Sequence, residues 1–133
     1  MLSMASDSSD HHFSLAVSLS VEALKALLWF NGGAATALIA LTSKKPGSVD
    51  YGRAVLIFGL GVLLTVVAMA FGYFSQLSYA NHRLADEQQK TATAKREYAH
   101  HRFWQTAALI AVALSLAASA VGMATAFYAI EVS

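Results

Sequence analysis

Two long runs without charged side chains dominate the pattern of hydrophobic and polar positions along the chain. Residues 54–74 and 103–130 contain no Asp, Glu, Lys or Arg. At 1.5 Å per residue a helix over 54–74 is about 31 Å long, which matches the roughly 30 Å of bilayer hydrocarbon. The second run is longer than the bilayer requires, so its helix must tilt or leave its first turn in the interface. We therefore predict transmembrane helices at about 54–74 and 104–130.

A third apolar run covers 26–42 and holds seventeen uncharged residues. This length is the lower limit for a membrane span, and the Asn-Gly-Gly sequence at 31–33 interrupts it. A buried core helix or an interfacial helix is the alternative interpretation. The abrupt Lys-Lys-Pro-Gly sequence at 44–47 favours a span at about 24–43, which gives three transmembrane helices.

The N-terminal residues are polar and carry no positive charge. The first thirteen residues include two aspartates and neither Lys nor Arg, so the basic region of a signal peptide is missing. We expect residues 1–12 to form a disordered tail and residues 13–133 to form a single membrane domain.

The polar segment 75–103 separates the two longest apolar runs and contains neither Gly nor Pro. Most of its residues favour helix, but one straight helix would carry the chain about 44 Å from the membrane and prevent the next span from returning. The chain must therefore reverse, and we predict an αα-hairpin with its tip at 89–93 whose arms continue the two spans. A faint heptad repeat predicts the residues at the seam between the arms: Leu77, Leu84, Thr91 and Tyr98.

Positive charge is distributed unevenly between the two sides of this arrangement. The N-terminus and the 75–103 hairpin share one side, which carries six Lys and Arg residues, whereas the other side carries three. The positive-inside rule places the side with more cations in the cytoplasm. We predict an integral protein of a bacterial inner membrane with its N-terminus and hairpin cytoplasmic.

The composition of the 133 residues agrees with this picture and excludes several classes of function. Hydrophobic residues make up 56% of the chain and charged residues 13%, about half the charged fraction of soluble domains. The absence of cysteine excludes disulfides, thiolate metal sites and cysteine nucleophiles. A net charge of +1 argues against nucleic acid as a partner. Catalytic and nucleotide-binding motifs are also missing, so we expect neither an enzyme nor a cofactor.

Small residues recur at intervals of four in each predicted span, which is the pattern of helices that pack closely in lipid. One interpretation is that these rows hold the three helices of one chain together. The other is that three short helices leave one row for a partner subunit. The candidate packing residues are Gly32, Gly33, Thr36, Gly61, Thr65, Gly72, Ala111, Ser115, Ser119 and Gly122.

Asn31 is the strongly polar side chain inside a predicted span. We interpret it as a hydrogen-bonding group between helices, and the alternative is a role in gating or ion contact. Glu22 and Lys25 are spaced i, i+3 just before this span and are expected to pair at the membrane surface.

Three histidines of the polar segment are candidate metal ligands: His82, His100 and His101. His82 and His100 mirror each other about the predicted tip, and imidazole is a common ligand of zinc, copper and nickel. No carboxylate is placed to complete such a site, so solvent exposure at the membrane surface is the favoured interpretation.

These features predict a small non-enzymatic membrane protein that acts as an oligomeric or accessory subunit and docks through its hairpin. Its expected partners are the lipid bilayer and either its own copies or another membrane subunit. The alternatives are a pore-forming protein of the holin or toxin-effector class and a small oligomeric transporter of ions or metabolites. In span count alone the layout resembles small bacterial or phage membrane proteins, holins among them, and this resemblance assigns no residue a role.

Overall fold

The protein consists of three long α-helices. A computed structural model describes the backbone of residues 2–42 and 49–132 and the side chains of residues 14–42 and 51–131. The helices are α1 (Leu2–Thr42), α2 (Val49–Glu87) and α3 (Thr91–Val132), and the described residues contain no strand. Each helix contains a stretch that is long and apolar enough to cross a membrane. The predicted all-α bundle with three transmembrane helices is therefore confirmed.

Helix α1 begins earlier than the sequence pattern suggests. It starts at Leu2, so residues 2–12 are helical rather than the disordered tail that we expected. No glycine or proline occurs before Gly32, and nothing in the first residues forces the helix to break.

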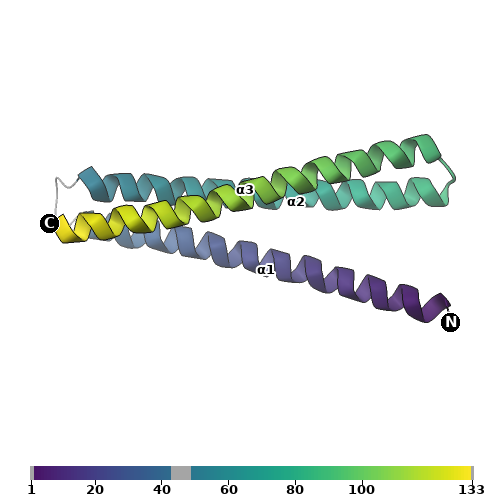
Figure 1. Ribbon diagram of the computed structural model, residues 1–133, viewed down its shortest axis with the longest axis horizontal. Helices are drawn as coiled ribbons and strands as arrows, with labels where there is room; N and C mark the ends of the chain where they lie inside the picture. Colours follow the sequence, from purple (N-terminus) through teal and green to yellow (C-terminus); the bar gives the residue numbers. More distant parts are fainter. Residues whose placement is uncertain (1, 43–48, 133) are drawn as a thin grey trace.

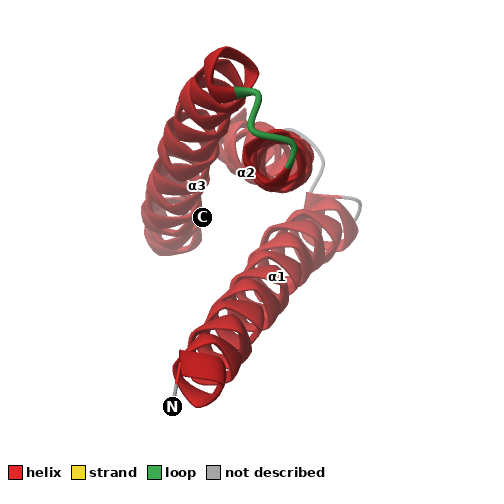
Figure 2. Cartoon of the chain, turned by 90° about the vertical axis from the view of Figure 1, so that its right-hand side faces the viewer, coloured by secondary structure: helices red, strands yellow, loops and turns green. Residues whose placement is uncertain are grey.

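The helices run up, down and up, with α2 and α3 side by side over their whole length (Figure 1). The N-terminus of α1 and the turn between α2 and α3 lie at the same end of the molecule. Helix α1 packs mainly on α2 through its C-terminal half, and its N-terminal half diverges from the other two helices (Figure 2). The structure is therefore a tight pair of helices with a third helix attached at one end.

The seam between α2 and α3 consists mostly of small side chains. Its buried positions follow one another at intervals of three and four, as in a coiled coil, and small residues let the two backbones approach closely. On α2 these are Tyr51, Ala54, Phe58, Gly61, Thr65, Ala68, Ser75, Ser78 and Ala85, and on α3 Ala94, Ala111, Ser115, Ala118, Gly122 and Ala129.

The heptad predicted for the hairpin seam is wrong. Leu77, Leu84 and Thr91 are exposed on the arms, and Tyr98 is also exposed although its ring contacts His82 of the opposite arm. Ser75, Ser78, Ala85 and Ala94 fill the seam instead. Small residues occupy these buried positions because the arms continue the close spacing that the small residues set within the membrane.

The predicted αα-hairpin is confirmed, and its reversal occupies residues 88–90. Gln89 has a positive φ of 55°, its N–H donates to the carbonyl of Asp86 at 2.9 Å, and the N–H of Lys90 donates to the carbonyl of Ala85 at 2.9 Å. These two bonds define a Schellman motif, in which a left-handed residue ends the helix. Glycine usually takes that position, and here glutamine does.

A group of aromatic side chains surrounds α2 and α3 where the apolar runs end. The ring centroids of Phe71 and Phe74 lie 5.3 Å from that of Trp104, and Phe103 and Tyr73 join the same group through neighbouring rings. Aromatic belts of this kind mark the boundary between hydrocarbon and headgroups. We call these five residues the aromatic belt. Helix α2 has 39 residues and is about 58 Å long, so its last turns extend beyond this boundary into water.

Candidate functional site

The most distinctive feature inside the membrane is a layer of four buried polar side chains, one from α1, one from α2 and two from α3. Asn31, Thr65 and Ser115 are fully buried, and Ser119 is 6% exposed. We call these four residues the polar layer. Polar groups at this depth are costly in lipid unless each one finds a hydrogen-bond partner.

Each group of the polar layer has such a partner. The amide of Asn31 donates through Nδ2 to Ser115 Oγ at 3.3 Å and accepts at Oδ1 from Ser119 Oγ at 2.8 Å. Thr65 Oγ1 and Ser115 Oγ lie 2.9 Å apart, and both are 2.9 Å from the carbonyl oxygen of Gly61. The layer therefore ties all three helices together at one level.

The hydroxyl groups of the polar layer also lie within hydrogen-bond distance of backbone carbonyl oxygens. Ser119 Oγ is 2.9 Å from the carbonyl of Ser115, in addition to its contact with Asn31. Either Thr65 or Ser115 can donate to the Gly61 carbonyl while the other donates to its neighbour's hydroxyl oxygen. Because these groups satisfy one another, the layer is a closed hydrogen-bonded junction, and none of the hollows described below is lined by it.

Gly61 makes room for the polar layer. A Cβ atom at this position would lie 2.8 Å from both Cγ and Oδ1 of Asn31 and 2.9 Å from its Nδ2. Gly122 plays the same part next to the core, where a Cβ would lie 3.0 Å from the ring of Phe58. Phe58 is 2% exposed and also contacts Phe30 edge-on, with ring centroids 6.2 Å apart.

The other predicted packing residues divide between the inside and the outside of the bundle. Ala111 is buried in the α2–α3 seam, and Gly32 and Gly72 are partly buried. Gly33 and Thr36 are exposed, on a part of α1 that neither α2 nor α3 covers. Gly32, Gly33, Thr36 and Ala37 together line a shallow hollow on the outside of the protein next to Val62.

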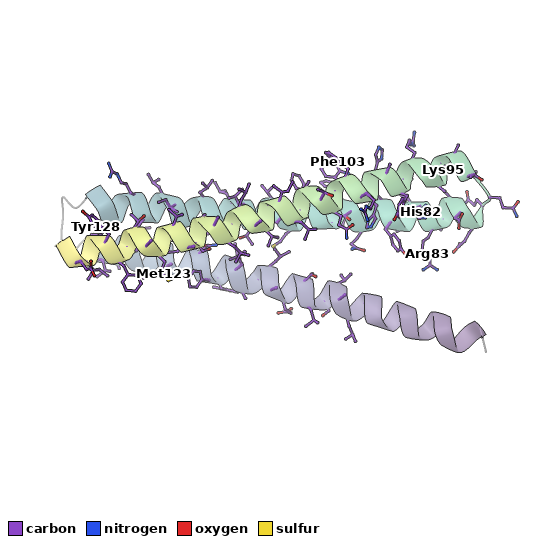
Figure 3. The ribbon with its side chains drawn as sticks, viewed as in Figure 1. His82, Arg83, Lys95, Phe103, Met123 and Tyr128 are labelled. Carbon is purple, nitrogen blue, oxygen red and sulfur yellow. The ribbon has the colours of Figure 1, made fainter. Side chains whose placement is uncertain are left out.

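A second cluster lies in the hairpin, outside the aromatic belt. His82 and Tyr79 of α2 and Tyr98 and His101 of α3 form a ring of aromatic contacts, with centroids of neighbouring rings 5.2 to 6.3 Å apart. We call these four residues the ring cluster. His82 lies between the arms, whereas Arg83 and Lys95 lie on their outer sides (Figure 3).

Each histidine of the ring cluster forms a hydrogen bond to a backbone carbonyl of the opposite arm. His82 Nδ1 lies 2.9 Å from the carbonyl of Ala94 on α3, and His101 Nδ1 lies 2.9 Å from the carbonyl of Ser75 on α2. A carbonyl oxygen only accepts, so Nδ1 of each ring is the donor in these contacts. Ser75 is buried and its hydroxyl adds a contact of 2.9 Å to the same His101 nitrogen.

The structure brings together His82 and His101 but not His100, which is exposed on the outside of α3. No group of three or more His, Cys, Asp or Glu side chains within the described residues could hold a metal ion. The predicted mirror pair of His82 and His100 is thus wrong, because the turn lies at 88–90 and places His101 on the inner face of its arm. Glu22 and Lys25 do pair, with Nζ 2.7 Å from Oε1, as the i, i+3 spacing predicted.

A crevice opens where α1 diverges from the other helices. Two adjoining hollows of about 410 and 470 Å³ share Ser20 and Leu24 of α1, Gly72 and Gln76 of α2, and Gln105 of α3. We call them together the crevice. Its mouth lies beside the aromatic belt, its walls are apolar, and its inner end includes Leu27 and Leu116, one turn from the polar layer.

The fold and these sites define a helical integral membrane protein with three spanning segments. No protein-family model, curated protein or solved structure matches the chain. The sequence pattern indicated every member of the polar layer as a candidate residue. It did not predict the crevice, because the angle at which α1 leaves the other two helices is not encoded in any local sequence pattern.

Proposed function

We propose that the protein is a non-enzymatic membrane subunit that associates with its own copies or with a larger membrane complex through α1. The observation that carries this proposal is the incomplete cover of α1. Its apolar stretch is far less buried than those of α2 and α3, although all three helices lie in the same membrane.

The exposed face of α1 is suited to another helix. Gly33 and Thr36 are exposed next to Gly32 and Ala37, and a Cβ at Gly33 would meet nothing within 4 Å among the described residues. Close helix contacts in lipid depend on such small residues, because apolar contact alone gains little there. Trp29, at the edge of the same hollow, is 80% exposed and offers a large surface to a partner.

The hairpin is the second element of the proposal. It is a rigid, water-exposed extension of two spanning helices, held by the ring cluster, and it supplies a docking element on the aqueous side. The six-to-three distribution of cations supports a cytoplasmic position for it, in a bacterial inner membrane.

The polar layer favours assembly over conduction by one chain. Its four side chains are satisfied by one another and by backbone carbonyls of the same bundle. A pore or a transport path would therefore have to form between chains rather than within one.

The test compares Gly33→Leu with Gly59→Leu in native mass spectrometry and crosslinking of the full chain in mild detergent. A Cβ atom at either glycine meets no other group of the described residues within 4 Å, and circular dichroism of both variants checks that their helix content matches the wild type. We expect the wild type and Gly59→Leu to form oligomers or to co-purify with a defined membrane complex, and Gly33→Leu to lose this association. A wild-type protein that is monomeric in both measurements and after crosslinking in membranes contradicts the proposal.

A further inference from the structure

We propose that the crevice binds an acyl chain of an ester-linked membrane lipid, with the ester carbonyl oxygens accepting hydrogen bonds from the amides of Gln76 and Gln105. This inference rests on the crevice and its mouth, and it does not depend on the association of α1 with a partner.

The first step of the argument is the chemistry of the mouth. Gln76 and Gln105 both line the two hollows, and neither side chain has a hydrogen-bond partner within the part of the chain that the structure describes. The other polar groups at this level are occupied, since Ser20 donates to the carbonyl of Ala16 and Ser75 contacts His101. Gln76 is half-buried and Gln105 is exposed, so both amides can donate to an acceptor that a lipid presents at this edge of the membrane.

The second step is the depth of these amides. Gln76 follows the apolar run 54–74 by two residues, and Gln105 adjoins Trp104 of the aromatic belt. The belt marks the hydrocarbon boundary, which is where the ester groups of glycerolipids lie. The amides and the ester carbonyls are therefore at the same level, and an amide NH₂ donates where an ester carbonyl accepts.

The third step is the shape and charge of the crevice below the mouth. Its walls continue inward past Leu24 and Val112 to Leu116, and no charged side chain lines either hollow among the described residues. Its two parts, of about 410 and 470 Å³, fall within the range of about 300–1,000 Å³ typical of small-molecule sites. A flexible apolar chain with an uncharged acceptor at its outer end fits this description, and a charged or wholly apolar molecule does not.

The experiment measures retained lipid on the purified full chain by native mass spectrometry. The probes are dioleoyl phosphatidylcholine and its diether analogue, which has the same headgroup and chains but no ester carbonyls. We expect the wild type to retain the diester lipid more than the diether lipid by roughly threefold to tenfold, the ratio for one net hydrogen bond in a membrane.

Three variants separate the contributions. Gln76→Leu combined with Gln105→Leu removes the amides at a half-buried and an exposed position and should abolish the preference for the diester lipid. Ala108→Trp fills the crevice wall and should lower retention of both lipids. Leu114→Trp, on an exposed face of α3 that does not line the crevice, is the control and should behave as the wild type.

A photoreactive side chain at Val112, which lines the crevice and is half-buried, identifies the occupant. Crosslinks to lipid support the proposal, and crosslinks to a second copy of the chain overturn it. Equal retention of the two lipids by the wild type, or retention that Ala108→Trp leaves unchanged while its helix content matches the wild type, also overturns it.

Discussion

The side chain of Asn31 on α1 fills the space that a Cβ atom would occupy at Gly61 on α2. The distance from that Cβ to the Asn31 amide would be 2.8 Å, which no folded protein accommodates without a shift. Asn31 cannot move away freely, because its amide is bonded to both Ser115 and Ser119. The missing side chain of Gly61 on α2 therefore leaves the space that the polar side chain of Asn31 on α1 fills.

This match predicts that Gly61→Ala destabilises the protein by about 1–3 kcal/mol, the usual cost of overpacking a filled site. The loss should appear in reversible unfolding followed by circular dichroism. Gly59→Ala is the control, because its Cβ has open space and alanine favours helix over glycine. A Gly61→Ala protein as stable as the Gly59→Ala protein would show that α1 does not pack at this level.

Replacing Asn31 by Leu should loosen α1 while leaving the α2–α3 pair intact. The substitution removes both bonds that α1 makes to α3 in the polar layer, each about 0.6 kcal/mol in membrane proteins on average. The hydroxyls of Ser115 and Ser119 keep their backbone acceptors, so the cost stays modest. The chain has no cysteine, which permits spin labels at chosen sites.

Distances between labels at Leu19 and Leu84 report on α1, and distances between Leu56 and Phe127 report on the α2–α3 pair; all four positions are exposed. We expect the first distribution to broaden in Asn31→Leu and the second to stay as in the wild type. Broadening of both would mean that the polar layer holds the whole bundle rather than α1.

In the hairpin, His101→Ala should lower the protection of backbone amides against hydrogen exchange throughout residues 75–103. The substitution removes a bond to the Ser75 carbonyl and two ring contacts, worth about 1–3 kcal/mol together. His100→Ala is the matched control, because His100 is the next residue along the helix and its side chain is exposed. Equal protection in the two variants would show that the ring cluster does not hold the two arms together.

At the tip, Gln89→Gly should stabilise the hairpin by a few tenths to about 1 kcal/mol. Gln89 is held at a φ of 55°, which costs a residue with a Cβ and costs glycine nothing. Part of the gain is offset because glycine also widens the unfolded ensemble. Gln88→Gly, at a position without a positive φ, should destabilise the protein in the same unfolding measurement.

Much of the fold follows from local patterns in the sequence. Uncharged runs define the spans, and a polar segment without glycine or proline, placed between two of them, requires a helical hairpin. The polar layer was foreseen only in part, because Asn31, Thr65, Ser115 and Ser119 were each singled out as packing or polar residues but not as partners. Which hydroxyl meets Asn31 depends on the register between α1 and α3, and no periodicity within one helix fixes it.

The two wrong predictions, the heptad and the histidine pair, also failed because contacts between helices decide features that the pattern within one helix does not. The heptad through Leu77 and Leu84 has the right period, but the seam selects small residues over apolar ones. The pairing of His82 with His100 assumed a turn centred in the predicted tip at 89–93. The left-handed conformation of Gln89 places the turn at 88–90 instead. A glycine at 89 would have signalled its position.

Neither α2 nor α3 has a break between the bilayer and the tip of the hairpin, and the single proline of the chain, Pro46, lies outside both helices. We therefore expect a displacement applied at 88–90 to pass along both helices, and the hydrogen bonds of His82 and His101 to the opposite arm oppose sliding of one arm past the other. A partner bound at the tip is thus expected to shift the opposite end of the membrane-spanning pair as well, by translation along the helix axis or by tilt.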